Sequence, residues 1–332
     1  MDPSRPHNVG RTMSQAEGDQ ADSLQARKSG LVKTARRSND ARRVTMQAST
    51  SETGPGVVAP GARLEKLAGG FDFTEGSTCD AHGNIFFTDQ PNDRILKWSA
   101  EGELSTFLHP AGRANGMYFD PRGHLIACAD ERNALWSIAP DGTVSVIVAE
   151  YEGKPLNGPN DVWVRSDGAI YFTDPFYKRS WWTHNTMPQD GQHVYFLCPE
   201  RRRLVRVADD LEKPNGIIGT PDGKTLYVAD IGAGRTYRYD IAPDGGLAGK
   251  TLAAARGSDG MTLDNEGHLY LTGDGVVVFD SAGRQIDRIR VPGEQWTANV
   301  SFGGNDRRML FITASTGLYG VRMRVTGANA AK

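Results

Sequence analysis

The chain has 332 residues, a formal net charge of −2 and a pI near 6.4. This balance excludes the strongly basic surface that nucleic acid or an anionic membrane requires, so a neutral small molecule is the expected partner. No apolar stretch approaches the roughly 20 residues of a membrane span. The cysteines form no CxxC pair and lie in or beside apolar runs, which predicts buried, reduced thiols at Cys79, Cys128 and Cys198.

The first 60 residues form a separate composition class, rich in Ser, Arg, Gln, Ala and Gly and almost free of aromatic residues. Such a composition cannot bury a core, and it predicts a disordered tail over residues 1–60. Arg pairs at 36–37 and 42–43 are followed by no apolar segment, and acidic residues interrupt the stretch, so we expect a cytoplasmic location rather than an export or transit signal. A leftover expression-vector segment and a later true start at Met46 stay open as alternatives.

A repeat occupies the rest of the chain. In each copy an oxygen-bearing side chain precedes an apolar, strand-like run, and a Gly-containing turn separates that run from a second one that ends near Thr-Asp. The copies are spaced by 40, 45, 55, 44 and 40 residues, the range expected when one repeat is one four-stranded propeller blade. The six leading residues are Glu75, Asn115, Asn160, Asn215, Asp259 and Asn299.

The first repeat reads as four short strands, EGSTCD, NIFFTD, RILKWS and LSTFLH, between turns that contain Gly, Asp, Asn or Pro. Blades two to five repeat this order, but the sixth ends after GLYGVRMRV without an outermost strand. Propellers avoid such an open edge by borrowing a strand from the other terminus. RLEKLA, at 63–68, has no blade of its own and is predicted to close the sixth. The predicted fold class is therefore all-β, a six-bladed β-propeller of four-stranded blades over residues 61–327.

The strand path decides which loops share a face. If the innermost strand of a blade starts at one face of the disc, the second strand runs back and ends at that same face. The loop after the second strand and the loop that leads into the next blade therefore lie on one face. The six leading residues should therefore ring one mouth of the central channel. The 55-residue spacing comes from an insertion at 175–192 that lies on the same face. His82, His124 and His268 occupy turns on the opposite face, where we expect them to be exposed to solvent.

The leading residues offer carboxylate and amide oxygens, and none is His, Cys or Met. Such hard donors suit Ca2+ at about 2.3 to 2.6 Å, while Zn2+ favours imidazole or thiolate. The ring thus predicts one calcium ion at the channel mouth, held by some of the six. The alternative is that Asn-Gly, Asp-Gly and Glu-Gly are ordinary turn dipeptides, as single occurrences usually are.

The ordered motifs FTEG, LNGPNDV, KPNGI and SDGM, together with GAIYFTDP, PDGKTLYVAD and WTANVSFGG, resemble the gluconolactonase, regucalcin and senescence-marker-protein family over residues 63–326. The resemblance implies a six-bladed propeller with one catalytic divalent ion, usually calcium, in its channel. Matched motif by motif, it implies that Glu75, Asn160, Asn215 and Asp259 are the metal ligands and that Asp259 is also the general base.

Two positions depart from the family's patterns. The regucalcin branch has an Arg two positions before the Asn that matches Asn160, whereas this chain has Gly158, which puts sugar specificity in doubt. The related phosphotriesterases bind a second, structural calcium with a His near the end of the fifth blade's second strand. This chain has Gly273-Asp274 there and no matching His.

The insertion supplies candidate walls for a pocket, because Tyr177, Trp182 and His184 offer stacking surface and a hydrogen-bond partner. An aromatic loop that packs on its own blade or on a partner subunit is the alternative for Trp181 and Trp182. Two further candidates for substrate contact share the mouth without matching a family ligand, namely Asn115 and Asn299.

These features predict a calcium-dependent hydrolase of small lactones, most plausibly gluconolactone-type sugar lactones. The ion would polarise the carbonyl while a carboxylate accepts the proton of the attacking water. No GxSxG motif supplies a nucleophile. Hydrolysis of aryl esters or phosphotriesters at the same metal is an alternative, and a non-catalytic scaffold with a structural metal is another. The oligomeric state stays open.

Overall fold

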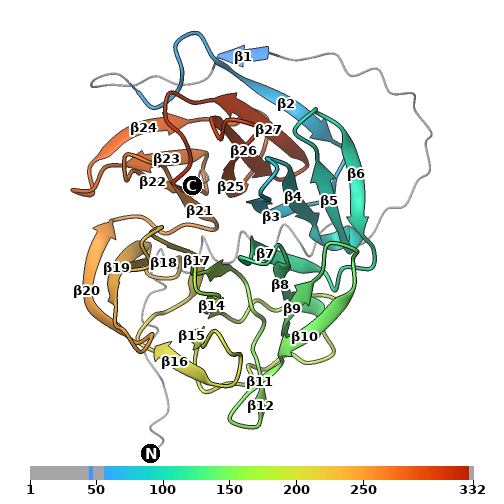
Figure 1. Ribbon diagram of the computed structural model, residues 1–332, viewed down its shortest axis with the longest axis vertical. Coiled ribbons are helices and arrows are strands. Elements are labelled where there is room, and N and C mark those ends of the chain that lie inside the picture. The colour runs from blue at the N-terminus through green and yellow to red at the C-terminus, as the bar shows by residue number, and fades with distance from the viewer. Residues whose placement is uncertain (1–44, 48–55, 329–332) are drawn as a thin grey trace, which may run out of the picture.

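Six antiparallel sheets surround a central axis in the computed structural model, which describes residues 45–47 and 56–328 (Figure 1). The sheets follow one another round the axis in chain order, and each begins at the axis with its innermost strand. This arrangement confirms the predicted six-bladed β-propeller with four-stranded blades.

The strands of each blade have the following bounds, from the axis outward. Blade one holds β3 (Thr74–Cys79), β4 (Ile85–Asp89), β5 (Arg94–Trp98) and β6 (Leu104–Leu108). Blade two holds β7 (Ala114–Phe119), β8 (Leu125–Ala129), β9 (Ala134–Ile138) and β10 (Val144–Val148). Blade three holds β13 (Val162–Val164), β14 (Ile170–Asp174), β15 (His193–Leu197) and β16 (Leu204–Ala208).

Blade four holds β17 (Pro214–Gly219), β18 (Thr225–Asp230), β19 (Arg235–Ile241) and β20 (Leu247–Ala254). Blade five holds β21 (Met261–Leu263), β22 (Leu269–Leu271), β23 (Val276–Phe279) and β24 (Gln285–Ile289). Blade six holds β25 (Thr297–Gly303), β26 (Met309–Ala314), β27 (Gly317–Arg322), β2 (Arg63–Gly69) and β1 (Thr45–Gln47). Outside the blades lie the hairpin β11 (Glu150–Tyr151) and β12 (Lys154–Pro155) and the 3-10 helices η1 (Gln90–Asn92) and η2 (Asp130–Arg132).

A strand from the N-terminal side of the chain closes the sixth blade. β2 pairs antiparallel with β27, with Glu65 opposite Gly320, so the predicted closing strand is confirmed. β1 pairs with the outer edge of β2. Val57 is buried, and its amide donates to Asp287 Oδ2 of blade five at 3.0 Å. Most of the tail predicted over residues 1–60 lies outside the described residues, whereas 45–47 and the segment from 56 onward attach to the propeller.

The innermost strands pack side by side and close a ring round the axis. Each contacts the next, and β25 contacts β3. β-Bulges interrupt the pairing of these strands beside four leading residues, at Glu75, Asn115, Asn215 and Asn299. A bulge breaks the regular alternation of side chains between the two faces of a sheet. These residues therefore depart from the pleated arrangement where the channel begins.

Glycine follows four leading residues because the innermost strands approach each other too closely for a Cβ atom. A Cβ on Gly76 would lie 1.9 Å from the Asn115 carbonyl oxygen. A Cβ on Gly216 would lie 2.4 Å from the Asp259 carbonyl oxygen. The Glu-Gly, Asn-Gly and Asp-Gly pairs are therefore contacts between blades, and the alternative of ordinary turn dipeptides does not apply here.

Aspartates at the ends of second strands hold the loops that lead into the innermost strands. Asp174 accepts hydrogen bonds from the amides of Asn157 and Gly158 at 2.9 and 2.8 Å. Asp89 and Asp230 accept amide hydrogen bonds in the corresponding loops of blades one and four. The recurrent Asp of the repeat thus fixes the backbone from which the leading residue reaches the channel.

Apolar side chains fill the space between neighbouring blades. The largest cluster joins blades three, four and five and extends from Trp163 to Phe279. Cys128 and Cys198 are buried, Cys79 is partly exposed, and all three are free thiols as predicted. Within the described part of the chain, no helix is long and apolar enough to cross a membrane.

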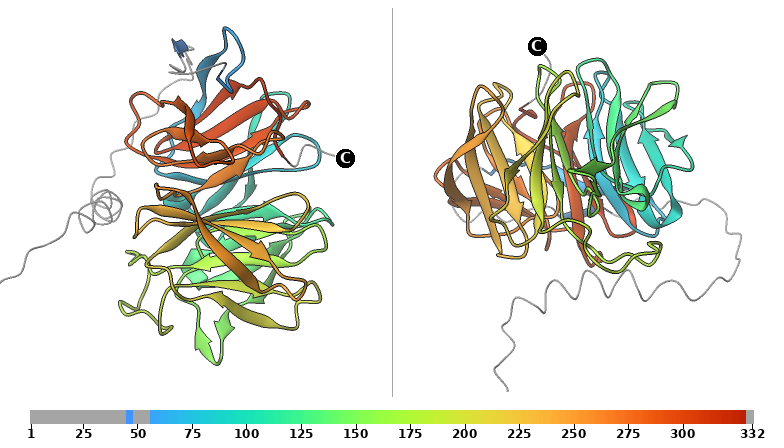
Figure 2. Two further views of the ribbon diagram at one scale, coloured as in Figure 1. Left: turned by 90° about the vertical axis from the view of Figure 1, so that its left-hand side faces the viewer. Right: turned by 90° about the horizontal axis from the view of Figure 1, so that it is seen from below.

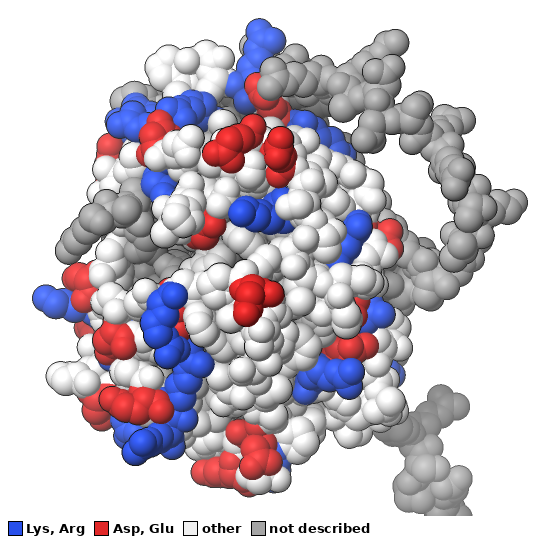
Figure 3. Space-filling view, turned by 45° about the vertical axis from the view of Figure 1, so that its right-hand side comes forward, with Lys and Arg blue, Asp and Glu red and all other residues white. Residues whose placement is uncertain are grey.

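The two faces of the disc carry different segments. In the right-hand view of Figure 2, the long loop between β14 and β15 lies below the blades. We call the side with the long loop the ligand face, because the strand path also puts the leading residues there. Figure 3 views the molecule from the other side, where basic and acidic side chains are intermingled.

Candidate active site

The ligand-face ends of the innermost strands carry the four predicted metal ligands. Glu75 and Asn215 are the second residues of β3 and β17, while Asn160 and Asp259 stand just before β13 and β21. Glu75, Asn160 and Asn215 are buried, and Asp259 is partly buried. Oxygen-bearing side chains from blades one, three, four and five are thus held at the ends of packed strands.

A chain of hydrogen bonds fixes two of these side chains. The Nδ2 of Asn215 donates to Asp259 Oδ1 at 2.9 Å and to the hydroxyl of Tyr177 at 2.8 Å. The Nε1 of Trp296 donates to Asp259 Oδ2 at 2.6 Å. Because both Nδ2 hydrogens have acceptors, the Asn215 amide has a single orientation, with its carbonyl oxygen directed elsewhere.

That carbonyl oxygen is the observation that fits a cation. Asn215 Oδ1 is buried and has no hydrogen-bond partner among the described residues. A buried acceptor without a donor costs roughly 1–3 kcal/mol, and the ionised carboxylates of Glu75 and Asp259 would add further acceptors. No three His, Cys, Asp or Glu side chains in the described ranges cluster as a metal site. Two carboxylates with amide oxygens instead suit a hard ion such as Ca2+.

Burial raises the pKa of both candidate carboxyl groups. Burial raises the pKa of Glu75, the charge of Asp259 raises it further, and Arg179 opposes the shift. Burial also raises the pKa of Asp259, against hydrogen bonds from Trp296 and Asn215 and the charge of Arg179. A bound divalent cation favours the ionised form of both groups. The ionised forms of both groups are therefore unfavourable unless positive charge lies nearby.

The insertion is anchored to blade two. Asp130, at the start of η2, accepts a hydrogen bond from Trp181 Nε1 at 2.9 Å through Oδ2, and its carbonyl accepts one from Trp182 Nε1 at 2.8 Å. The Nε of Arg179, a side chain only 5% exposed, lies 3.4 Å from Asp130 Oδ2. Both tryptophans therefore contact the neighbouring blade, a packing that neither sequence alternative anticipated.

The three insertion residues predicted to contact substrate differ in their surroundings. Tyr177 is buried and hydrogen bonded to Asn215. Trp182 stacks on His184 with ring centroids 4.8 Å apart. His184 Nε2 is buried and has no hydrogen-bond partner within the described ranges, as expected of a group that meets a ligand. Substrate contact by Tyr177, Trp182 and His184 stays a prediction.

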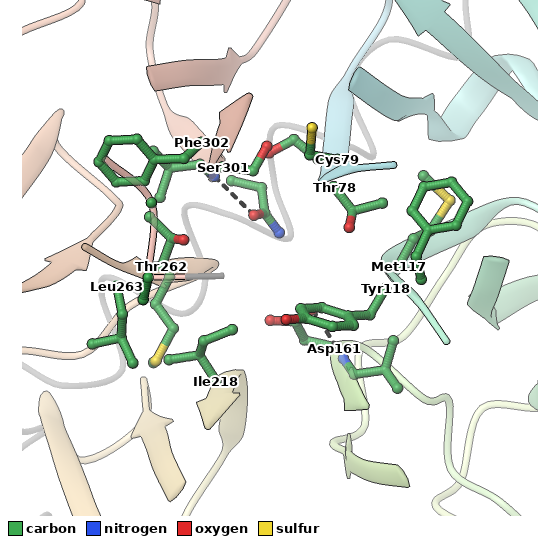
Figure 4. A pocket seen from close by; sticks show the side chains of 18 of the residues that line it. Thr78, Cys79, Met117, Tyr118, Asp161, Ile218, Thr262, Leu263, Ser301 and Phe302 are labelled. Atoms are coloured by element: carbon green, nitrogen blue, oxygen red, sulfur yellow. Dashed lines mark hydrogen bonds between the residues drawn. The ribbon is translucent and has the colours of Figure 1, made fainter. Parts of the chain in front are cut away.

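The remaining leading residues, Asn115 and Asn299, are buried in the channel wall. Asn299 Oδ1 accepts a hydrogen bond from the Val300 amide at 2.8 Å, and the residue lines a cavity of about 310 Å3 that occupies the channel beyond the candidate ligands. Figure 4 looks into this cavity, which Asp161 also lines. Burial raises the pKa of Asp161 to about 7. Substrate contact by Asn115 and Asn299 likewise stays a prediction.

The turn histidines lie away from this end of the channel. His82 is exposed, as predicted. His124 and His268 are only partly exposed, because their Nδ1 atoms lie within hydrogen-bond distance of Ser137 Oγ at 3.2 Å and Asp264 Oδ2 at 2.8 Å. For these two, the expectation of full solvent exposure was wrong.

The family model described as SMP-30/Gluconolactonase/LRE-like region matches residues 73–316. The chain belongs to this family. A gluconolactonase of Zymomonas mobilis is 28% identical over 80% of this chain and 82% of its own length. A lactonohydrolase of Aspergillus oryzae is 29% identical over 60% of this chain and 52% of its own length. The solved structure of a gluconolactonase from Xanthomonas campestris has a TM-score of 0.74 and 30% identity, over 85% of this chain and all of that one (100%).

The structure gives a physical account of the two positions at which this chain departs from patterns within the SMP-30/gluconolactonase family, Gly158 and Gly273-Asp274. A Cβ on Gly158 would lie 2.7 Å from the ring of Trp182, so the insertion fills the space that a longer side chain at 158 would need. The Asp274 side chain is 86% exposed and pairs with Arg288. It therefore points into solvent, away from the channel.

Sequence reasoning missed four residues of this family member's site. Trp296 and Asp161 lie within motifs that carried the resemblance, so their position beside the leading residues was an available signal. Arg179 lies in the insertion, where only aromatic residues and His184 were considered. Asp130 is the Asp that follows the second strand of blade two. It binds the insertion and not its own loop, and no spacing in the sequence reveals this contact.

Proposed function

We propose that this protein hydrolyses small lactones with the help of one divalent cation, most plausibly Ca2+, and that gluconolactone-type sugar lactones are its substrate class. Relatives named gluconolactonase and lactonohydrolase support lactone hydrolysis. The residues that would hold the cation are Glu75, Asn160, Asn215 and Asp259.

One observation carries the proposal. Asn215 is locked by two acceptors for its Nδ2, and its buried Oδ1 has no donor among the described residues. Two carboxyl groups with raised pKa values share that end of the channel. An amide oxygen without a donor beside two carboxyl groups supports a cation at this end of the channel, and the absence of imidazole and thiolate from the set favours a hard one.

When bound, the cation supplies Lewis-acid polarisation of the lactone carbonyl. The remaining roles fall to the protein's own side chains. Asp259 accepts the proton of the attacking water, and the donors Trp296 Nε1 and Asn215 Nδ2 favour the ionised form that this role needs. Glu75 adds the second negative charge that balances a divalent ion. The ring ester then opens to a hydroxy acid without a covalent intermediate.

A substrate panel tests the proposal. Gluconolactone, an aryl ester and a phosphotriester are compared in calcium and in EDTA, with release of acid as the readout. Calcium-dependent turnover of the lactone above the calcium-and-buffer control is expected, and EDTA should abolish it reversibly. If only the aryl ester or only the phosphotriester is hydrolysed, that compound's class, and not lactones, is the substrate class. If no substrate is hydrolysed, the scaffold alternative is favoured.

A further inference from the structure

The cavity of about 310 Å3 in the channel has no role in the proposed hydrolysis (Figure 4). The four candidate metal ligands do not line it. Its wall comes from all six innermost strands and from the turn that follows β3, and it extends to Ala81, which is exposed on the face opposite the ligand face. The cavity is therefore reached from the opposite face, with the leading residues between it and the candidate active site.

One layer of the cavity wall takes an equivalent residue from every blade, two positions after the leading residue. We call these six side chains the channel layer: Ser77, Met117, Val162, Ile217, Met261 and Ser301. All six are buried. Blades six and one are neighbours in the ring, because β25 contacts β3. The two serines are therefore adjacent in ring order, and the channel layer is polar on one side and apolar round the rest.

The two serine hydroxyls are the observation that points to a ligand. Ser77 and Ser301 are 7% and 8% exposed, and neither Oγ has a hydrogen-bond partner within the described ranges. A serine hydroxyl can donate one hydrogen bond and accept others, and leaving it buried without a partner is unfavourable. An oxygen atom of a bound molecule would give both hydroxyls a partner, while the apolar side of the layer would cover that molecule's apolar surface.

The charged groups of the wall favour an uncharged ligand, because the protein already supplies them with hydrogen-bond partners. Asp161 accepts two backbone amide hydrogen bonds, at 2.9 and 3.1 Å. At the outer end, Arg307 donates to the carbonyl oxygens of Asp80 and Ala81 at 2.7 and 2.9 Å. The Asp80 carboxylate accepts a hydrogen bond from Asn84 Nδ2 at 2.7 Å. The two serine hydroxyls are thus the polar groups that a ligand would satisfy.

We propose that the channel layer binds a small uncharged organic molecule with one ring and one hydroxyl or carbonyl oxygen. The oxygen lies between Ser77 and Ser301, and the ring packs on the four apolar side chains. An apolar cavity of roughly 150 Å3 holds benzene, so a cavity of about 310 Å3 accommodates a substituted ring. This site is independent of lactone hydrolysis, because it uses a different end of the channel and different residues.

Phenol and toluene are matched probes, because they differ by a hydroxyl in place of a methyl group. Saturation-transfer NMR titrations give the Kd of each for the wild type, Ser77→Ala and Ser301→Ala. We expect each substitution to raise the Kd of phenol about fivefold, the effect of one neutral hydrogen bond. The Kd of toluene should stay within about twofold. Thermal melting should show that both variants are folded, since each loses a hydroxyl without a protein partner.

Ser145→Ala is the control, because Ser145 is exposed on β10 of blade two. It should leave the Kd of both probes unchanged. Dithiodipyridine, an uncharged disulfide that reacts with thiols, locates the probe. Cys79 lines the cavity and is partly exposed, whereas Cys128 and Cys198 are buried. Phenol should therefore slow the reaction of Cys79.

Three results would overturn the proposal. The first is no saturable binding of phenol, as expected if water alone fills the cavity. The second is an equal phenol Kd in the wild type and both channel-layer variants. The third is that benzoate, the charged probe, displaces phenol. All these measurements can be made in EDTA and repeated in calcium without any lactone, so they succeed or fail independently of the lactonase proposal.

Discussion

The hydroxyl of Tyr177 offers the sharpest test of the site, because it distinguishes a residue that orients a ligand from one that touches substrate. Tyr177→Phe keeps the ring against which Lys213 and Arg179 lie at 4.3 and 5.1 Å, and it removes the acceptor for Asn215 Nδ2. The amide retains its hydrogen bond to Asp259 Oδ1 at 2.9 Å. The substitution therefore loosens the orientation of Asn215 without removing it.

The expected loss is one neutral hydrogen bond, about 1 kcal/mol, which corresponds to roughly a fivefold rise in the Kd for calcium. Isothermal titration of the metal-free protein with calcium measures this value. At saturating calcium, KM for the lactone should match that of the wild type within about twofold, since the lost contact is to the metal ligand.

Tyr195→Phe is the matched control, because Tyr195 is also buried in blade three and its hydroxyl has no hydrogen-bond partner in the described part of the chain. Removing that hydroxyl should leave the calcium Kd unchanged. The reasoning fails if Tyr177→Phe raises KM and leaves the calcium Kd alone, because the hydroxyl would then act on substrate directly.

The remaining predictions concern the general base, the protonation of a channel carboxyl group and the contacts between strands. Asp259→Asn should lower kcat/KM for a lactone by at least about a hundredfold at saturating calcium, and a loss below tenfold would remove Asp259 as the base. In EDTA, Tm should fall as pH rises from about 4 to about 7, because burial raises the pKa of Asp161 to about 7 and the native state therefore keeps a proton that the unfolded chain has lost. Asp161→Asn should flatten this slope, and an equal slope in the variant would contradict the assignment. Gly76→Ala should destabilise the fold by roughly 3 kcal/mol or more, since its Cβ would lie 1.9 Å from the Asn115 carbonyl oxygen. Gly61→Ala, also at positive φ but with nothing within 4 Å of its Cβ, should cost clearly less in urea unfolding.

The fold was predictable because the same sequence pattern recurs in every copy of the repeat. Strand-length apolar runs, Gly-containing turns and an unfinished sixth copy were enough to infer six blades and the closing role of the segment at 63–68. The strand path then placed the insertion and the leading residues on one face. These inferences need only the local pattern of apolar and turn residues and a regular strand order, and both can be read from the sequence.

The walls of the site were less predictable, because they depend on contacts between blades. Asp130 has the same sequence position as Asp174, yet it holds Trp181 of the next blade and not its own loop. The guanidinium of Arg179 reaches the mouth only because that anchoring folds the insertion over blade two. No spacing rule encodes such a pairing, so it emerged from the coordinates alone.

The closure of blade six by β2 has a consequence for how the ring is assembled. β2 precedes the strands of blades one to five in the chain, whereas its inner partner β27 begins at Gly317 and follows them all. Contacts of such long separation form slowly. Until β27 has been made, β2 cannot take its place in blade six, and the unsealed edge stays open to neighbouring nascent chains. The contact that turns a row of blades into a closed circle thus waits for β27, which follows every other strand of the ring in chain order.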